Sequence, residues 1–213
     1  MFKNLLSQLV QSMGATLSIF VITLVLSLPL GLLVAFGRMS KCKPLKALVS
    51  LYILLMRGTP LMLQLFAVYF FLPSWLGIKI SRIHATYIAF TLNYAAYFAE
   101  IYRSGIASVP QGQYEAGKVL GLSKSQTFFR IIFPQVIKHI LLPVGNEAIT
   151  LVKDTSLAST IAVSELFRVA KDATSSSASL VPLFTAGIFF LLLNTLVTLF
   201  FHFSEKKLEY YKV

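Results

Sequence analysis

Two carboxylates in an otherwise apolar stretch carry much of the chemistry that this sequence offers. Glu147 and Asp154 lie seven residues apart, with Thr150 between them. In an α-helix that spacing is about two turns, so the three side chains share one side. Ionisable groups are costly inside a membrane and usually line a cavity or pair with one another. The pattern favours a face that binds an ammonium group or a basic side chain. The alternative for Asp154 is that it caps a segment beginning at Thr155.

Arg57 is the cation that complements these carboxylates. It lies about nine residues into the second apolar run, roughly 14 Å from the start of a helix. Pro60 is expected to begin a new helical segment with Thr59 as its cap, so that the positive end of this segment and Arg57 together hold a carboxylate. Two alternatives remain open: Arg57 snorkels to the membrane interface, or Glu147 pairs with Arg57 or Lys138.

Neutral hydrogen-bonding groups lie on the third apolar run. Asn93, Tyr94 and Tyr97 supply amide and hydroxyl groups that could bind a polar ligand, although each is equally well explained as a packing residue. Glu100 and Arg103 are three residues apart, and we predict that they pair along one helix face as a structural feature.

Nothing in the pattern favours catalysis. The segment Gly112 to Lys118 matches G-x-x-x-x-G-K, but Val119 follows where a nucleotide-binding loop needs Ser or Thr for Mg²⁺, and no buried strand precedes it. The single cysteine, Cys42, excludes an intrachain disulfide and a cysteine-based metal site. Three histidines on separate segments are interpreted as interfacial or packing residues: His84, His139 and His202. We expect no catalytic residue, metal or cofactor in this chain, so its energy source must be a partner or an ion gradient.

The composition is that of a membrane protein. Of the 213 residues, 56% are hydrophobic and only 13% are charged, and the mean hydropathy is +0.76. The net charge of +11 indicates contact with anionic lipid rather than with nucleic acid. Long apolar runs predict five transmembrane helices, at about 14–37, 48–74, 83–102, 132–152 and 180–203. Residues 153–179 are predicted to form an amphipathic segment or an extended loop.

The basic residues predict the orientation of these spans. Eleven Lys and Arg residues lie in the loops 38–46 and 103–130 and in the tail 206–212, against six on the opposite side. By the positive-inside rule, the C-terminus is cytoplasmic and the N-terminus is outside.

Residues 115–134 interrupt the apolar runs with a polar and charged segment. Pro110 favours the start of a short helix, and Gly121 can end it in the left-handed conformation. Ser123 and Gln126 form a capping box for a second short helix. We predict a helical elbow that transmits motion between the membrane and a soluble partner. A plain cytoplasmic loop is the alternative.

The same segment resembles the EAA motif of ATP-binding-cassette (ABC) importer permeases. The matching positions are Glu115, Ala116, Gly117, Gly121, Ile131 and Pro134. Two positions depart from the motif, because Gly117 stands where Ala is usual and Phe133 where Leu is usual. Three further stretches resemble the polar amino acid branch of the family, the histidine, glutamine and arginine type: 57–66, 99–117 and 153–159.

The resemblance implies one permease domain over residues 1–213, an all-α integral membrane protein with a cytoplasmic coupling-helix elbow between helices 3 and 4. In such a protein the residues that couple to the ATPase would be Glu115, Ala116, Gly117, Gly121, Ser123 and Pro134. A polar amino acid would be bound by Arg57, Thr59, Asn93, Tyr97, Glu147, Thr150 and Asp154.

The implied assembly lies in a bacterial inner membrane. Its partners are cytoplasmic ABC ATPase subunits, which bind ATP and Mg, a second copy or a similar permease, and an extracellular or periplasmic substrate-binding protein. The rival hypotheses are a self-sufficient secondary amino acid carrier, which needs inverted repeats and an ion relay, and an integral membrane enzyme.

Overall fold

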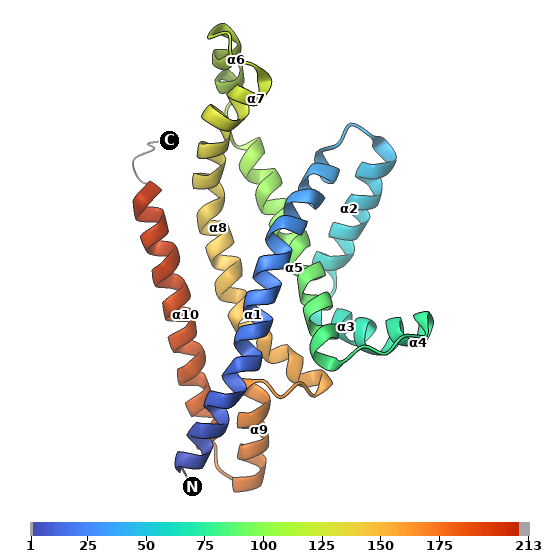
Figure 1. The fold of residues 1–213 in the computed structure, drawn as a ribbon, viewed down its shortest axis with the longest axis vertical. Helices are drawn as coiled ribbons and strands as arrows, with labels where there is room; N and C mark the ends of the chain where they lie inside the picture. Colours follow the sequence, from blue (N-terminus) through green and yellow to red (C-terminus); the bar gives the residue numbers. More distant parts are fainter. Residues whose placement is uncertain (1, 209–213) are drawn as a thin grey trace.

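The computed structural model describes residues 2–208, and within that range the chain forms helices and connecting turns without a β-strand (Figure 1). Three segments are long and apolar enough to cross a membrane: Asn4–Met39, Lys124–Ile161 and Val181–Lys207. The pair Lys43–Gly58 and Leu61–Leu76 adds a fourth if this bent pair is one span. The helix at 82–107 is 26 residues long but is not among them.

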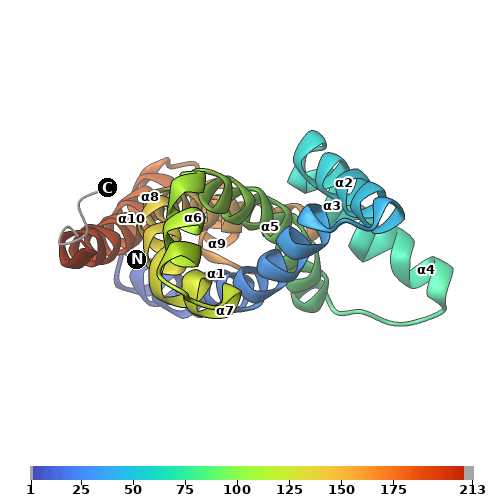
Figure 2. The ribbon, with the colours of Figure 1, turned by 90° about the horizontal axis from the view of Figure 1, so that it is seen from above.

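The centre of the bundle is the pair formed by α1 (Phe2–Met39) and α5 (Arg82–Ala107), which cross at close range (Figures 1 and 2). A Cβ atom on Gly31 would lie 2.8 Å from the Cβ of Phe98 and 3.0 Å from the carbonyl oxygen of Ala95. Only glycine therefore allows the two backbones this approach. α1 runs through Pro29 without interruption.

The second apolar run is not the single span that the sequence predicted. α2 (Lys43–Gly58) and the helix Leu61–Leu76 are bent by 109°, because Pro60 removes a backbone donor and holds the preceding Thr59 in an extended conformation. The predicted cap was also wrong. Pro60 occupies the N-cap position without a side-chain hydrogen bond, and the Thr59 hydroxyl donates to the carbonyl oxygen of Leu55 at 2.7 Å.

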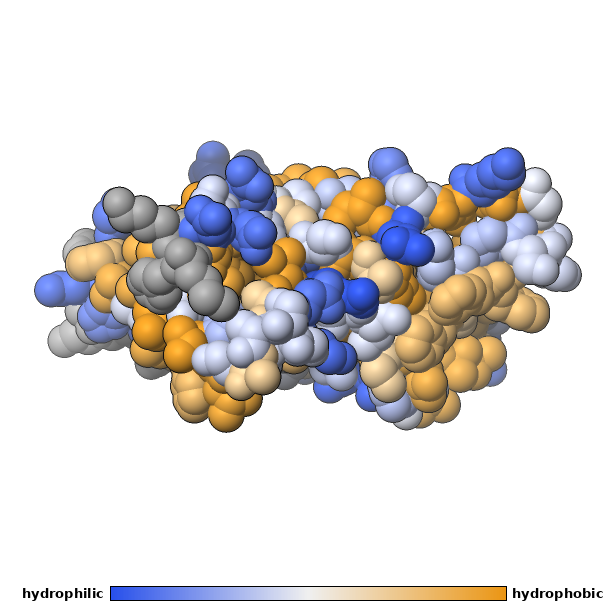
Figure 3. Space-filling view, turned by 90° about the horizontal axis from the view of Figure 1, so that it is seen from below, coloured by the Kyte–Doolittle hydropathy of each residue, from blue (hydrophilic) through white to orange (hydrophobic). Residues whose placement is uncertain are grey.

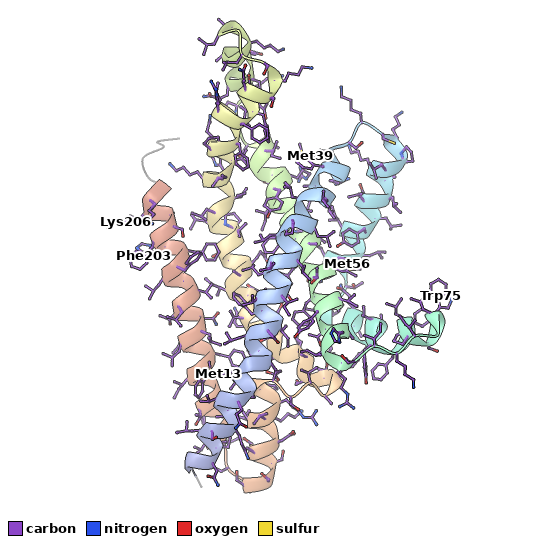
Figure 4. All side chains as sticks on the ribbon, viewed as in Figure 1. Met13, Met39, Met56, Trp75, Phe203 and Lys206 are labelled. Carbon is purple, nitrogen blue, oxygen red and sulfur yellow. The ribbon has the colours of Figure 1, made fainter. Side chains whose placement is uncertain are left out.

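Beyond the bend lies an arm made of α3 (Leu61–Phe66), the π-helical turn η1 (Ala67–Phe71) and α4 (Leu72–Leu76). Large apolar side chains on this arm are exposed, and Trp75 projects from its tip (Figure 4). Seen from below, the molecule mixes hydrophilic and apolar residues over its surface (Figure 3).

The second half of the chain forms α8 (Phe133–Asp154), the 3₁₀ helix η3 (Thr155–Ile161), α9 (Leu166–Ser177) and α10 (Val181–Leu208). The N-terminal end of α1 and the C-terminal end of α10 lie at opposite ends of the bundle (Figure 1). The prediction of an amphipathic segment at 153–179 is confirmed, since α9 buries Leu166 and Ala170 and leaves its other side exposed.

α9 is fastened to α1 through its first turn. Glu165 is fully buried, and its carboxylate accepts hydrogen bonds of 2.7 Å from the backbone N–H groups of Phe167 and Arg168. The adjacent N–H of Leu166 donates to the hydroxyl of Thr16 on α1 at 3.1 Å. These bonds satisfy three donors at the helix start, where an intrahelical partner is lacking.

Candidate functional site

An open cavity of about 470 Å³ lies between α2, α5 and α8. Three of the residues predicted to bind substrate line it together: Arg57 from α2, Tyr97 from α5 and Glu147 from α8. The cavity thus has a cation on α2, an aromatic hydroxyl on α5 and an anion on α8. Such an arrangement can hold a small molecule that carries both charges.

Arg57 is exposed on α2, and its guanidinium lies 5.1 Å from the ring centroid of Tyr97. A cation at this distance from an aromatic face is attracted to the ring. The contact keeps Arg57 at the cavity, with its donors free to bind an acceptor there.

Asp154 and Thr150 do not line the cavity with Glu147. Asp154 accepts a hydrogen bond of 2.8 Å from the hydroxyl of the buried Tyr94, and Thr150 donates to the carbonyl oxygen of Asn146 on its own helix at 3.0 Å. Asp154 stands at the N-cap position of η3 but makes no side-chain capping bond, so the capping alternative was wrong. Its observed contact joins α8 to α5.

Asn93 and Thr59 belong to a hydrogen-bonded network that holds the bend after α2. The amide of Asn93 donates to the carbonyl oxygen of Met56 and to Oε1 of Gln64, both at 2.9 Å. Gln64 in turn donates from Nε2 to the Thr59 hydroxyl at 2.8 Å. Sequence reasoning missed Gln64, whose signal is that it is the one polar residue in the run LMLQLFAVYFF.

A charged cluster closes one side of the cavity. Glu100 is held by Arg103 at 2.8 Å, which confirms the predicted pair, and also by Arg38 of α1 at 3.6 Å. The Arg38 contact spans 62 positions of the chain, so local spacing could not predict it. His139 also lines the cavity, and its Nε2 is buried without a hydrogen-bond partner in the described part of the chain.

The elbow consists of α6 (Gln111–Val119), α7 (Lys124–Thr127) and the π-helical turn η2 (Phe128–Ile132), at the far end of the bundle (Figure 1). The two predicted short helices are confirmed. Gly121 has φ +69°, and Ser123 and Gln126 make both bonds of the capping box.

The unusual Gly117 has a steric cause in this elbow. A Cβ at this position would lie 2.5 Å from both Oγ1 and Cγ2 of Thr127, so Thr127 fills the space that the usual Ala would occupy. At the tip, Val119 and Leu120 are 88% and 72% exposed. Glu115 and Ala116 are exposed as well. Exposed apolar side chains at the tip of a polar elbow are typical of a contact surface.

The cavity and the elbow meet at the end of α5. Ser108 lines the charged cavity and also a second cavity, which lies under the elbow. Among residues 2–208, no group of three His, Cys, Asp or Glu residues could hold a metal ion.

An all-helical membrane bundle with a charged cavity and an exposed helical elbow defines a membrane transport subunit. A family model described as the binding-protein-dependent transport system inner membrane component matches residues 27–210. The chain belongs to this family, and the resemblance to ABC importer permeases is confirmed.

Curated relatives and a solved structure agree with this assignment. The L-cystine transport system permease protein TcyB of Bacillus subtilis (strain 168) is 38% identical over 92% of this chain and 84% of its own length. The arginine transport system permease protein ArtQ of the same organism is 34% identical over 94% of this chain and 92% of its own. A crystal structure of an amino acid ABC transporter with histidines superposes with a TM-score of 0.88 at 29% identity, and the match covers 97% of this chain and 96% of that one.

Proposed function

We propose that this chain is the permease subunit of an ATP-driven importer for polar amino acids. The observation that carries the proposal is the cavity with Arg57 and Glu147 on different helices, joined at Ser108 to the elbow. An α-amino acid carries a carboxylate for Arg57 and an ammonium group for Glu147. The amino acid transport named for the relatives supports this substrate class.

The subunit crosses the membrane five times, through α1, the bent α2 and its arm, α5, α8 and α10. Its elbow and C-terminus face the cytoplasm, and its N-terminus faces outward, in a bacterial inner membrane. The excess of Lys and Arg in 38–46, 103–130 and 206–212 supports this orientation. A second permease copy, or a similar permease, completes the pathway, and the open form of the cavity supports this.

ATP and Mg are bound by cytoplasmic ATPase subunits, and an external binding protein delivers the amino acid. The elbow docks in a groove of the ATPase through the exposed Val119 and Leu120, as a helix-in-groove contact. Movement of the elbow reaches the cavity through the end of α5 and through α8, which continues from the elbow without a break.

The test is transport by the reconstituted complex. The chain is co-expressed with its ATPase and binding protein, and ATP-dependent uptake of arginine, glutamine and cystine is measured in liposomes. Leu120→Asp should abolish uptake and uncouple ATP hydrolysis, because an acid at the tip cannot enter an apolar groove. Lys41→Asp, an acid in an exposed loop at the same end, serves as the matched control.

A further variant tests the cavity. Arg57→Gln should reduce uptake about tenfold or more while leaving the elbow docked, since one charge-assisted hydrogen bond contributes about 1.5–3 kcal/mol. Uptake by the permease alone, driven by an ion gradient and unchanged by Leu120→Asp, would replace the proposal with a secondary carrier.

A further inference from the structure

A second cavity, of about 730 Å³, lies between the end of α5 and the elbow. Its polar lining includes Tyr114, Lys118 and Lys124 from α6 and α7, together with Ser108, Gln111 and Thr127. Its apolar lining includes Ile106, Val109, Leu122 and Phe128. Neither the family assignment nor the charged cavity gives a role to these polar and apolar lining residues.

The two lysines give this cavity a positive charge that nothing in the described chain neutralises. Lys118 and Lys124 come from different helices, and neither ammonium group has an ion pair or hydrogen bond within residues 4–207. The nearest acid in the sequence, Glu115, is exposed and does not line the cavity. Lysine binds phosphate as a point charge, so the pair favours a phosphate-type anion.

Tyr114 adds a neutral donor beside the lysines. It lies one helical turn before Lys118, on the same face of α6. Its ring packs on the cluster formed by Val109, Ile132 and Val136, which fixes where the hydroxyl lies. Two exposed lysines and a tyrosine, from two helices, therefore line the same cavity.

The apolar lining of this cavity favours a phospholipid over a free phosphate. A free phosphate gains nothing from Ile106, Leu122 and Phe128, whereas a phosphate attached to acyl chains buries hydrocarbon against them. The cavity is also lined by Lys124, the first residue of the candidate span Lys124–Ile161. Anionic lipid in the cytoplasmic leaflet attracts basic residues by about 1 kcal/mol each.

We propose that the cavity under the elbow binds the headgroup of an anionic phospholipid through Lys118, Lys124 and Tyr114. The lipid phosphate joins α6 to α7 and holds both against the end of α5. The inference rests on the proposed cytoplasmic position of the elbow, but it requires neither transport nor a substrate.

The test measures lipid retention directly. The complex of this permease with its ATPase is placed in nanodiscs of phosphatidylcholine with phosphatidylglycerol, and bound phosphatidylglycerol is counted by native mass spectrometry after delipidation. The double variant Lys118→Gln and Lys124→Gln should weaken retention about tenfold or more, as expected for two lysines near anionic lipid. The control is Lys41→Gln with Lys43→Gln, which removes two exposed lysines that do not line the cavity and should retain the lipid.

Three outcomes would overturn the proposal. Equal retention by the double variant and the native chain would show that the lysines do not bind the lipid. Displacement of phosphatidylglycerol by millimolar inorganic phosphate would identify a free phosphate site. Protection of both lysines from acetylation by the ATPase, in phosphatidylcholine alone, would identify a protein interface. Because retention is read without ATP or amino acid, failure here leaves the transport assay to judge the proposed function separately.

Discussion

Two helix pairs meet at a glycine, but what each glycine faces is different. Gly31 of α1 faces backbone atoms of α5, the carbonyl oxygen of Ala95 at 3.0 Å and the amide nitrogen of Ala99 at 3.3 Å, measured from an added Cβ. The three atoms nearest to an added Cβ on Gly145 of α8 all belong to the side chain of Phe201 on α10, with Cγ at 2.9 Å, Cδ1 at 3.0 Å and Cβ at 3.3 Å. Moving a backbone displaces its whole helix, whereas a change in the χ1 rotamer of Phe201 moves Cγ and Cδ1 away from Gly145. The α1–α5 pair is therefore a fixed unit, and α8–α10 is adjustable.

Besides the direct packing of α5 on α8, which includes the hydrogen bond from Tyr94 to Asp154, two joints connect these pairs. At one end, α9 packs on α1 through Leu9 and on α10 through Ala186. At the other end, the elbow links α5 to α8, with Gly117 against Thr127 at its centre. A transporter that alternates between two openings needs such a division into a fixed unit and a movable one. The following substitutions test it.

The largest effect is expected at the fixed pair. Gly31→Leu forces α1 away from α5 and should destabilise the fold by at least about 3 kcal/mol, with loss of monodisperse protein in detergent. Gly14→Leu is the control, since no atom lies within 4 Å of an added Cβ there. Similar thermal stability of the two variants would contradict the close packing of α1 on α5.

The α9 joint should respond to pH. Burial raises the pKa of Glu165 to about 7 from its ordinary value of 4.5, although its bonds to the N–H groups of Phe167 and Arg168 and the charge of Arg168 oppose the shift. The native state binds this proton more tightly than the unfolded chain, so stability is greatest below pH 4.5 and falls as the pH rises to about 7. The loss is about 3 kcal/mol at most.

This pH effect is measured as the apparent Tm of the purified protein between pH 5 and pH 8. Glu165→Gln keeps an oxygen acceptor for the helix cap but cannot ionise, so its Tm should vary less with pH. An equal slope in both proteins would show that other groups cause the dependence.

The elbow joint should show coupling between two residues. Gly117→Ala crowds Thr127 and should destabilise the elbow, and Thr127→Ala should relieve the crowding in the double variant even though it loses its bond to the carbonyl oxygen of Ser123. A coupling energy of about 1–2 kcal/mol is expected from a double-mutant cycle on ATPase docking. Additive single effects would argue against direct contact.

The smallest effect is expected at the adjustable pair. Gly145→Ala should cost less than Gly31→Ala, since Phe201 can change its χ1 rotamer to clear the added methyl group and alanine favours the helix. Thermal stability equal to or below that of Gly31→Ala would remove the contrast between the two pairs.

Local rules predicted much of this molecule from the sequence. The elbow followed from three positions, because a left-handed glycine and a capping box are decided within a few residues: Gly121, Ser123 and Gln126. The pair Glu100–Arg103 followed from helical spacing alone. Long apolar runs predicted the positions of α1 and α10, because the hydrophobicity of a segment depends only on its own residues.

The features that the sequence did not predict depend on contacts between residues that are far apart in the chain. The 109° bend is held by Gln64 and Asn93, which are 29 residues apart. Thr59 was assigned to a cap and Asn93 to a ligand, yet both hydrogen-bond within the bend. Of seven residues predicted to bind substrate, the structure brings Arg57, Tyr97 and Glu147 into one cavity, a grouping that three separate helices must create.

The bent arm carries an intrinsic fluorescent probe. Trp75 is the single tryptophan of the chain, and it is 75% exposed at the tip of α4 (Figure 4). Indole emission from the unlabelled permease therefore comes from one place. A blue shift on reconstitution would report that the arm tip has entered lipid or a neighbouring subunit, with no dye attached and no residue changed.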